Sequence, residues 1–218
     1  MKPTKEYNGR SRIRMFNADC MDFMEGCDKY DLAIVDPPYK DEFKITANGK
    51  CAKVNKDYDL SSLNSSSPND FYFNSLIGTT KNQIVWGVNY YKTYLGAGRI
   101  VWDKNNTGVY SDCELAFQSF SDVTRKYKFT WNGMLQENMK NKEHRIHPTQ
   151  KPVQLYKWLL TNYAKEGDTI LDTHGGSMSI AIACWDLGFD LDICELDTDY
   201  FNDAVKRFET HIAQTQLF

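Results

Sequence analysis

Short apolar runs alternate with amphipathic segments along most of this chain. The apolar runs are rich in β-branched residues and bounded by polar or turn residues, which favours buried strands over helices. We expect strands over residues 12–17, 32–35, 84–87, 100–103, 114–117, 126–131, 169–172 and 191–195. Apolar residues at helical spacing predict helices over residues 21–24, 70–80, 153–164, 180–187 and 197–212.

The order of these elements predicts an α/β fold. Strands separated by helices form parallel sheets, so most of the sheet should be parallel. The strands at 114–117 and 126–131 are separated only by a polar turn, which suggests an antiparallel hairpin at one edge. At 218 residues and 41% apolar composition, the chain fits one domain with a sizeable core.

The composition narrows the class of protein. A net charge of −3 argues against a uniformly basic surface, so any nucleic-acid partner would need a local basic patch. The six cysteines are scattered without a C-x-x-C pair, as expected for free thiols in a reducing compartment. His144 and His147 have no neighbouring cysteine or acid cluster, so we expect no metal site. With no apolar run of membrane-spanning length, we expect a cytoplasmic protein that does not contact a membrane.

The most informative stretch follows the second predicted strand, where Asp36, Pro37, Pro38 and Tyr39 stand in succession. Prolines cannot donate to a strand ladder, so the strand should stop here and leave fixed backbone carbonyls at its end. Asp36 and the Pro37 carbonyl could accept the two N–H groups of an exocyclic amine, and Tyr39 could stack on a base. The alternative is an ordinary strand-ending turn.

A second candidate site lies in the last third of the chain. The strand 169–172 leads into a turn that contains Gly175 and Gly176, a helix follows, and the next strand ends at Glu195. Glu195 lies 19 residues beyond Gly176. This spacing suits a carboxylate that binds the ribose hydroxyls of an adenosine-containing cofactor. Asp19, just past the first predicted strand, could bind a ligand or simply cap the helix that follows it.

Two further segments have unusual composition. Residues 122–151 carry seven basic residues against three acidic ones, interleaved with aromatic residues. This pattern is expected of a phosphate-facing surface, although a solvated face could look the same. Residues 40–70 lack periodicity and are rich in lysine and serine. We expect either a mobile lid beside the active site or a solvated insertion there.

Taken together, these motifs resemble the β class of amino-group DNA methyltransferases. The similarity runs from about residue 13 to residue 208 and is carried by Asp36-Pro-Pro-Tyr39, His147-Pro-Thr-Gln-Lys-Pro152, the turn at 171–177 and Glu195. The catalytic motif precedes the cofactor motif, which is the circularly permuted order of that class. Residues 86–90 and 101–104 further resemble compact members from phages and mobile elements. Two positions depart from the family pattern: His174 replaces a phenylalanine and Met178 replaces a glycine.

The resemblance implies a Rossmann-like methyltransferase fold over residues 1–218, a target-recognition insertion at about 120–146, and S-adenosylmethionine as cofactor. It implies double-stranded DNA as partner and a flipped adenine as target, with cytosine-N4 methylation or a catalytically silent DNA-binding module as alternatives. Homodimerisation is left open. The catalytic candidates are Asp36, Pro37, Pro38 and Tyr39. The cofactor candidates are Asp19, Thr149, Gln150, Lys151, Asp172, Thr173, His174, Gly175, Gly176, Ser177, Glu195 and Leu196. The DNA candidates are Lys40, Arg125, Lys126, Lys128 and Arg145.

Overall fold

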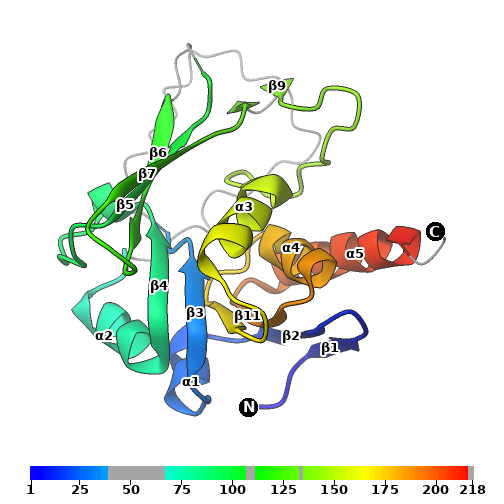
Figure 1. The fold of residues 1–218 in the computed structure, drawn as a ribbon. Helices are drawn as coiled ribbons and strands as arrows, with labels where there is room; N and C mark the ends of the chain where they lie inside the picture. The colour runs from blue at the N-terminus through cyan, green and yellow to red at the C-terminus, as the bar shows by residue number, and fades with distance from the viewer. Residues whose placement is uncertain (39–66, 107–110, 133–134, 216–218) are drawn as a thin grey trace.

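The computed structural model describes residues 1–38, 67–106, 111–132 and 135–215 (Figure 1). Nine strands of the described residues form one sheet in the order β1-β2-β11-β10-β3-β4-β6-β5-β7, and β8 pairs with β9. The strands are β1 (Lys5–Asn8), β2 (Arg12–Asn17), β3 (Tyr30–Val35), β4 (Thr80–Trp86), β5 (Arg99–Asp103), β6 (Cys113–Gln118), β7 (Thr124–Lys128), β8 (Trp131–Asn132), β9 (Leu135–Gln136), β10 (Thr169–Asp172) and β11 (Asp190–Glu195). The α-helices are α1 (Cys20–Glu25), α2 (Asp70–Thr79), α3 (Val153–Tyr163), α4 (Ser179–Leu187) and α5 (Thr198–Thr215).

The centre of the sheet is parallel, as the sequence predicts. Each neighbouring pair in the series β2, β11, β10, β3 and β4 is parallel, so the carboxyl ends of these strands lie at one edge. In open α/β sheets this edge is where ligands bind.

Helices cover both faces of the sheet (Figure 1). Successive residues of a strand point to opposite faces, and β3 shows the result. Leu32 and Ile34 pack in the core beneath α3, α4 and α5, whereas Ala33 and Val35 pack in the core beneath α1 and α2. The continuous apolar run in the sequence therefore reflects burial on two sides.

The predicted hairpin between the strands at 114–117 and 126–131 is wrong. β6 instead lies between β4 and β5 and is antiparallel to both, while β7 pairs in parallel with β5 at the edge. Burial explains the difference: Ala116 and Phe117 of β6 are both buried and fit an interior strand, whereas β7 is largely exposed and fits an edge. The sheet is still mixed and mostly parallel, with antiparallel pairing toward its edges.

No helix among the described residues is long and apolar enough to cross a membrane. They contain no group of three or more histidine, cysteine or acidic side chains that could hold a metal ion. Most of the expected lid at 40–70 lies outside the described residues.

Candidate active site

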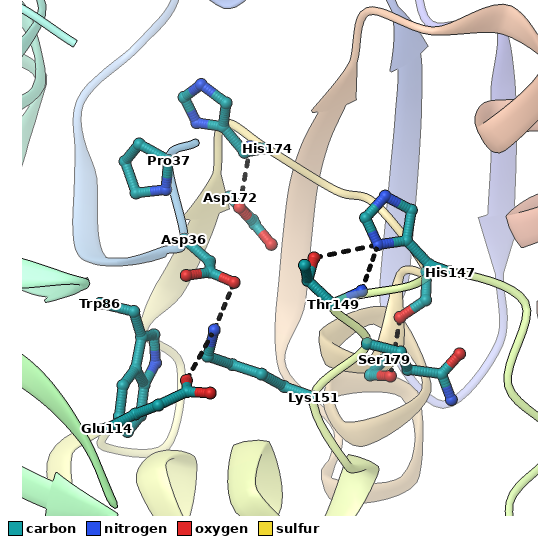
Figure 2. A network of polar contacts seen from close by, with 12 residues as sticks. Asp36, Pro37, Trp86, Glu114, His147, Thr149, Lys151, Asp172, His174 and Ser179 are labelled. Atoms are coloured by element: carbon teal, nitrogen blue, oxygen red, sulfur yellow. Dashed lines mark hydrogen bonds and ion pairs between the residues drawn. The ribbon is translucent and has the colours of Figure 1, made fainter. Parts of the chain in front are cut away.

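The ends of β3 and β10 bring the two motifs of the sequence together. Leu171 pairs with Ala33, so Asp172 at the end of β10 and Asp36 just past β3 share one edge of adjacent strands. Figure 2 shows both carboxylates in the same site. Burial, with the charges of Asp36 and Glu195, raises the pKa of Asp172 to about 8, against the lowering effect of a hydrogen bond from the His174 amide.

Asp36 belongs to a network of charges around the buried Lys151 (Figure 2). Its carboxylate pairs with the ammonium of Lys151, whose side chain is only 3% exposed. The same ammonium lies 3.2 Å from Glu114 Oε2, and Glu114 also pairs with Lys104. Burial disfavours the charge of Lys151, but Asp36 and Glu114 outweigh it and raise the pKa of the lysine. The ammonium of Lys151 therefore stays charged and holds the Asp36 carboxylate in place.

Beside Asp36, the Pro37 carbonyl accepts a hydrogen bond of 2.8 Å from the Tyr91 hydroxyl. A carbonyl oxygen has two lone pairs, so one remains for a further donor. Pro38 follows it, and Tyr39 lies outside the described residues. The acceptor pair expected from the sequence, Asp36 and the Pro37 carbonyl, thus stands at the end of β3.

The turn between β10 and α4 is compact. Gly175 donates to the Cys194 carbonyl at 2.7 Å, and a Cβ at this glycine would meet that oxygen at 3.1 Å. Gly176 has φ +49°, a left-handed conformation that favours glycine. Thr173 is buried and bonds both Tyr72 and His174, while Ser177 is held by Arg207 through its carbonyl. The backbone of this turn therefore packs closely against the end of β11.

Met178 ends the turn, and its side chain points into the protein core and not into the turn. Its backbone is left-handed, with φ 51°, and its side chain is fully buried in the core beneath α3, α4 and α5. The departure from the family glycine is thus accommodated by backbone strain and core packing.

Glu195 lies across from this turn at the end of β11. Its two carboxylate oxygens accept hydrogen bonds from the amides of Gly176 (2.7 Å) and Asp197 (2.9 Å). Burial raises its pKa. Leu196 is 65% exposed beside it. Asp19 caps α1 by accepting from the Met21 amide at 2.7 Å, which confirms the capping alternative and leaves its other oxygen for a ligand.

The segment 147–151 forms a wall of the site. His147 accepts hydrogen bonds from the amide and hydroxyl of Thr149, and burial lowers the pKa of this histidine to about 4. Its ring lies 3.8 Å from the position that a Cβ on Gly176 would occupy. Gln150 is buried and bonds the backbone of residues 144 and 146, so it shapes the segment from within. Lys151 reaches Asp36 rather than the glycine turn.

The profile of the DNA methylase family, which comprises N6 and N4 methyltransferases, matches residues 70–206. The chain belongs to this DNA methylase family. No curated protein is significantly similar to it.

Solved structures of methylases share its fold. The M1.HpyAVI complex with SAM is 21% identical, has a TM-score of 0.59, and is aligned over 89% of this chain and 99% of its own. The cytosine-N4-specific PvuII DNA methyltransferase is 11% identical, with a TM-score of 0.58 over 92% and 90% of the two chains. TTHA0409, a putative DNA modification methylase from Thermus thermophilus, is 16% identical, with a TM-score of 0.56 over 92% and 95%.

The basic residues of this methylase do not form one row. Lys126 and Lys128 alternate with Arg125 and Tyr127 along β7, so the two lysines point to the face opposite the arginine. Tyr127 stacks on Trp158 of α3, which places Arg125 on the side of the helices. Arg145 bonds the Pro148 carbonyl within its own segment, and Lys40 lies outside the described residues.

Three residues of the candidate site are not predicted from the sequence. Tyr91 sits in an aromatic-rich segment with no feature that distinguishes it from its neighbours. Glu114 belongs to a strand whose pattern is that of an ordinary sheet strand, Lys104 lies just past β5, and their contact depends on the reversed direction of β6. The sequence feature that could have indicated Glu114 and Lys104 is a charged residue at the start or just past the end of a buried strand.

Proposed function

We propose that this methylase transfers the methyl group of S-adenosylmethionine to the N6 amine of an adenine flipped out of double-stranded DNA. One observation carries the proposal: the acceptor pair of Asp36 and the Pro37 carbonyl stands beside the glycine turn after Asp172, at one edge of adjacent strands. A ligand on the turn and a base on the acceptors would therefore face each other.

The residues around the turn fit the cofactor. The turn at Gly175 and Gly176, the partly buried carboxylate of Glu195 and the exposed Leu196 match the methionine, ribose and adenine parts of such a ligand. Asp19 keeps one oxygen for the adenine amine, and Thr149 lies at the wall near the turn. When bound, S-adenosylmethionine supplies an electrophilic methyl group on a sulfonium.

The protein activates the amine by holding its hydrogens. An exocyclic nitrogen is a poor nucleophile because its lone pair is delocalised into the ring. Asp36 accepts one N–H and the Pro37 carbonyl accepts the other, which favours a tetrahedral nitrogen with its lone pair directed at the methyl group. Tyr39 would stack on the base, whose extrusion costs a few kcal/mol. The extra proton leaves the nitrogen after transfer, so a strong base is not required.

DNA contacts are assigned to the segment 120–146, with Lys126 and Lys128 on one face of β7 as phosphate partners. Adenine is favoured over cytosine because the β-class resemblance associates an aspartate at the first motif position with adenine. The similarity to a cytosine-N4-specific enzyme keeps that reaction as the second candidate.

The test uses the purified protein, double-stranded DNA of mixed sequence and S-adenosylmethionine. After digestion to nucleosides, mass spectrometry should find N6-methyladenine, and Asp36→Ala should abolish it while calorimetry still shows cofactor binding. N4-methylcytosine alone would replace the adenine assignment with the cytosine one. A wild-type protein that binds no cofactor and forms no product would support the silent DNA-binding module.

A further inference from the structure

The reversed direction of β6 places a glutamate in the site. Because β6 is antiparallel to β4 and β5, its first residues lie at the edge where those two strands end. Glu114 therefore stands near Trp86 at the end of β4, Lys104 just past β5 and Asp36 just past β3. In a parallel arrangement Glu114 would lie at the opposite edge.

The contacts of Glu114 are those of a bridge between two ammonium groups. One oxygen pairs with Lys104, and the other lies 3.2 Å from Lys151 Nζ as an ion pair without hydrogen-bond alignment. Lys151 also lies 5.4 Å above the centre of the Trp86 ring. Burial opposes the charge of Glu114, but the two lysines outweigh it and lower its pKa. The bridge is therefore ionised.

The charges in this network balance, since two carboxylates face two ammonium groups. Removing the charge of Glu114 would leave an excess positive charge beside the carboxylate that must accept an N–H of the target amine. Positive charge also develops on that amine as the methyl group arrives, and an unbalanced Lys151 would oppose it. Lys151 would then depend on Asp36 alone as its carboxylate partner in this network.

We propose that Glu114 is a positioning residue for methyl transfer. It anchors the Lys151 ammonium and cancels its charge, so that Asp36 remains oriented and available to the target amine. This inference rests on the proposed function.

The protonation of Lys151 reports on this role independently of activity. The ionisable groups that interact with the lysine are Asp36, Glu114, His147, Tyr156 and Asp172. Lys104 shares the Glu114 carboxylate with it. Of these, Asp36 and Glu114 hold the ammonium directly and raise its pKa. Without Glu114, burial should lower the pKa of Lys151.

The experiment compares wild type, Glu114→Gln and Glu114→Asp. Single-turnover methylation with saturating cofactor and DNA should slow by roughly 10- to 100-fold in Glu114→Gln, because a mispositioned acceptor loses rate at this scale. The residual rate should fall further on the alkaline side, at a pH where wild type stays flat, because a Lys151 that has lost its proton no longer anchors Asp36. Glu114→Asp keeps the charge, so its rate should be intermediate and its alkaline profile flat. NMR of lysines labelled at Cε, in protein without cofactor, should show Lys151 titrating at lower pH in Glu114→Gln.

Asp186→Asn is the matched control. Asp186 also bridges two basic groups, at 2.6 Å from Lys157 Nζ and 2.7 Å from His211 Nε2, but it lies among α3, α4 and α5. Its variant should keep the wild-type pH profile.

If the wild type is active, and Glu114→Gln has the same rate, alkaline profile and Lys151 titration as the wild type, the inference about Glu114 is wrong while the proposed function stands. A wild type that methylates no DNA would contradict the proposed function, and with it this role of Glu114.

Discussion

The Tyr91 hydroxyl donates a hydrogen bond to the Pro37 carbonyl at 2.8 Å and also lies 3.1 Å from the Trp86 carbonyl. One proton is thus shared between the ends of β3 and β4. Because prolines leave the backbone after β3 without ladder bonds, this hydroxyl is a tether that fixes where the Pro37 carbonyl points. The position of a proposed catalytic acceptor therefore depends on a side chain 54 residues away in the sequence.

Tyr91→Phe should slow methylation several-fold and lower the free energy of unfolding by about 1 kcal/mol, the usual value of one hydrogen bond. Cofactor affinity measured by calorimetry should stay the same, because the tether lies on the side of the target base. Tyr7→Phe is the control, since it removes a hydroxyl bonded to Glu209 at 2.7 Å on the far side of the sheet. Equal rate losses in the two variants would argue against a role for the tether.

Lys151→Met should lower the free energy of unfolding by about 3 to 5 kcal/mol at pH 7, because it leaves Asp36 and Glu114 without the buried cation between them. Urea denaturation measures this loss. Lys81→Met removes a cation whose side chain is 69% exposed and which pairs with Asp31, so it should change stability little. A Lys151 variant as stable as the Lys81 variant would contradict the buried network.

Much of this site was predictable because its parts are local. A β-branched run that ends in Asp36 and two prolines specifies a buried strand and its stopping point, and β3 ends at Val35 as expected. Asn69 precedes α2 and caps it by accepting from the Tyr72 amide, as asparagine commonly does at this position. The convergence of β3 and β10 followed from the rule that parallel strands end at one edge.

The strand order at the far edge was not predictable in the same way. The choice between a hairpin of β6 with β7 and the insertion of β6 between β4 and β5 depends on which partner buries Ala116 and Phe117, and the local pattern does not state the partner. Glu114 was missed for the same reason. Glu114 lies near the start of its strand. Whether the start of a strand lies at the ligand-binding edge of the sheet or at the opposite edge depends on the direction of that strand, which the local pattern does not give.

Asp172 should make stability depend on pH in a range where few groups titrate. Its pKa is raised by burial to about 8 in the folded protein, above the ordinary value of an unfolded aspartate. The folded state therefore binds the proton more tightly, and stability from this group is present at low pH and lost as pH rises toward 8. His147 and His174, whose pKa values are lowered to about 4 by burial, act in the opposite direction only below about pH 6.5.

Between pH 6.5 and 8 the protein without cofactor should lose about 1 to 2 kcal/mol of unfolding free energy from Asp172. Asp172→Asn should flatten this slope in urea denaturation series. Asp168→Asn, in the turn before β10, is the control and should retain the slope. If the unfolding free energy of Asp172→Asn still falls with pH as it does in wild type, another group is responsible for the pH dependence.

Met178→Gly separates backbone strain from core packing at the position where the family has glycine. Glycine should recover about 1 to 2 kcal/mol of left-handed strain, but loss of a fully buried methionine should cost about 2 to 5 kcal/mol, so the variant should be less stable overall. Met178→Leu keeps the volume and the strain, and its stability should fall by less than about 1.5 kcal/mol. Thermal unfolding measures both changes.

Because the methionine side chain packs into the core beneath α3, α4 and α5, calorimetry should find equal affinity for S-adenosylmethionine in wild type and Met178→Leu. Tighter binding in Met178→Gly than in both would show that residue 178 obstructs the cofactor after all.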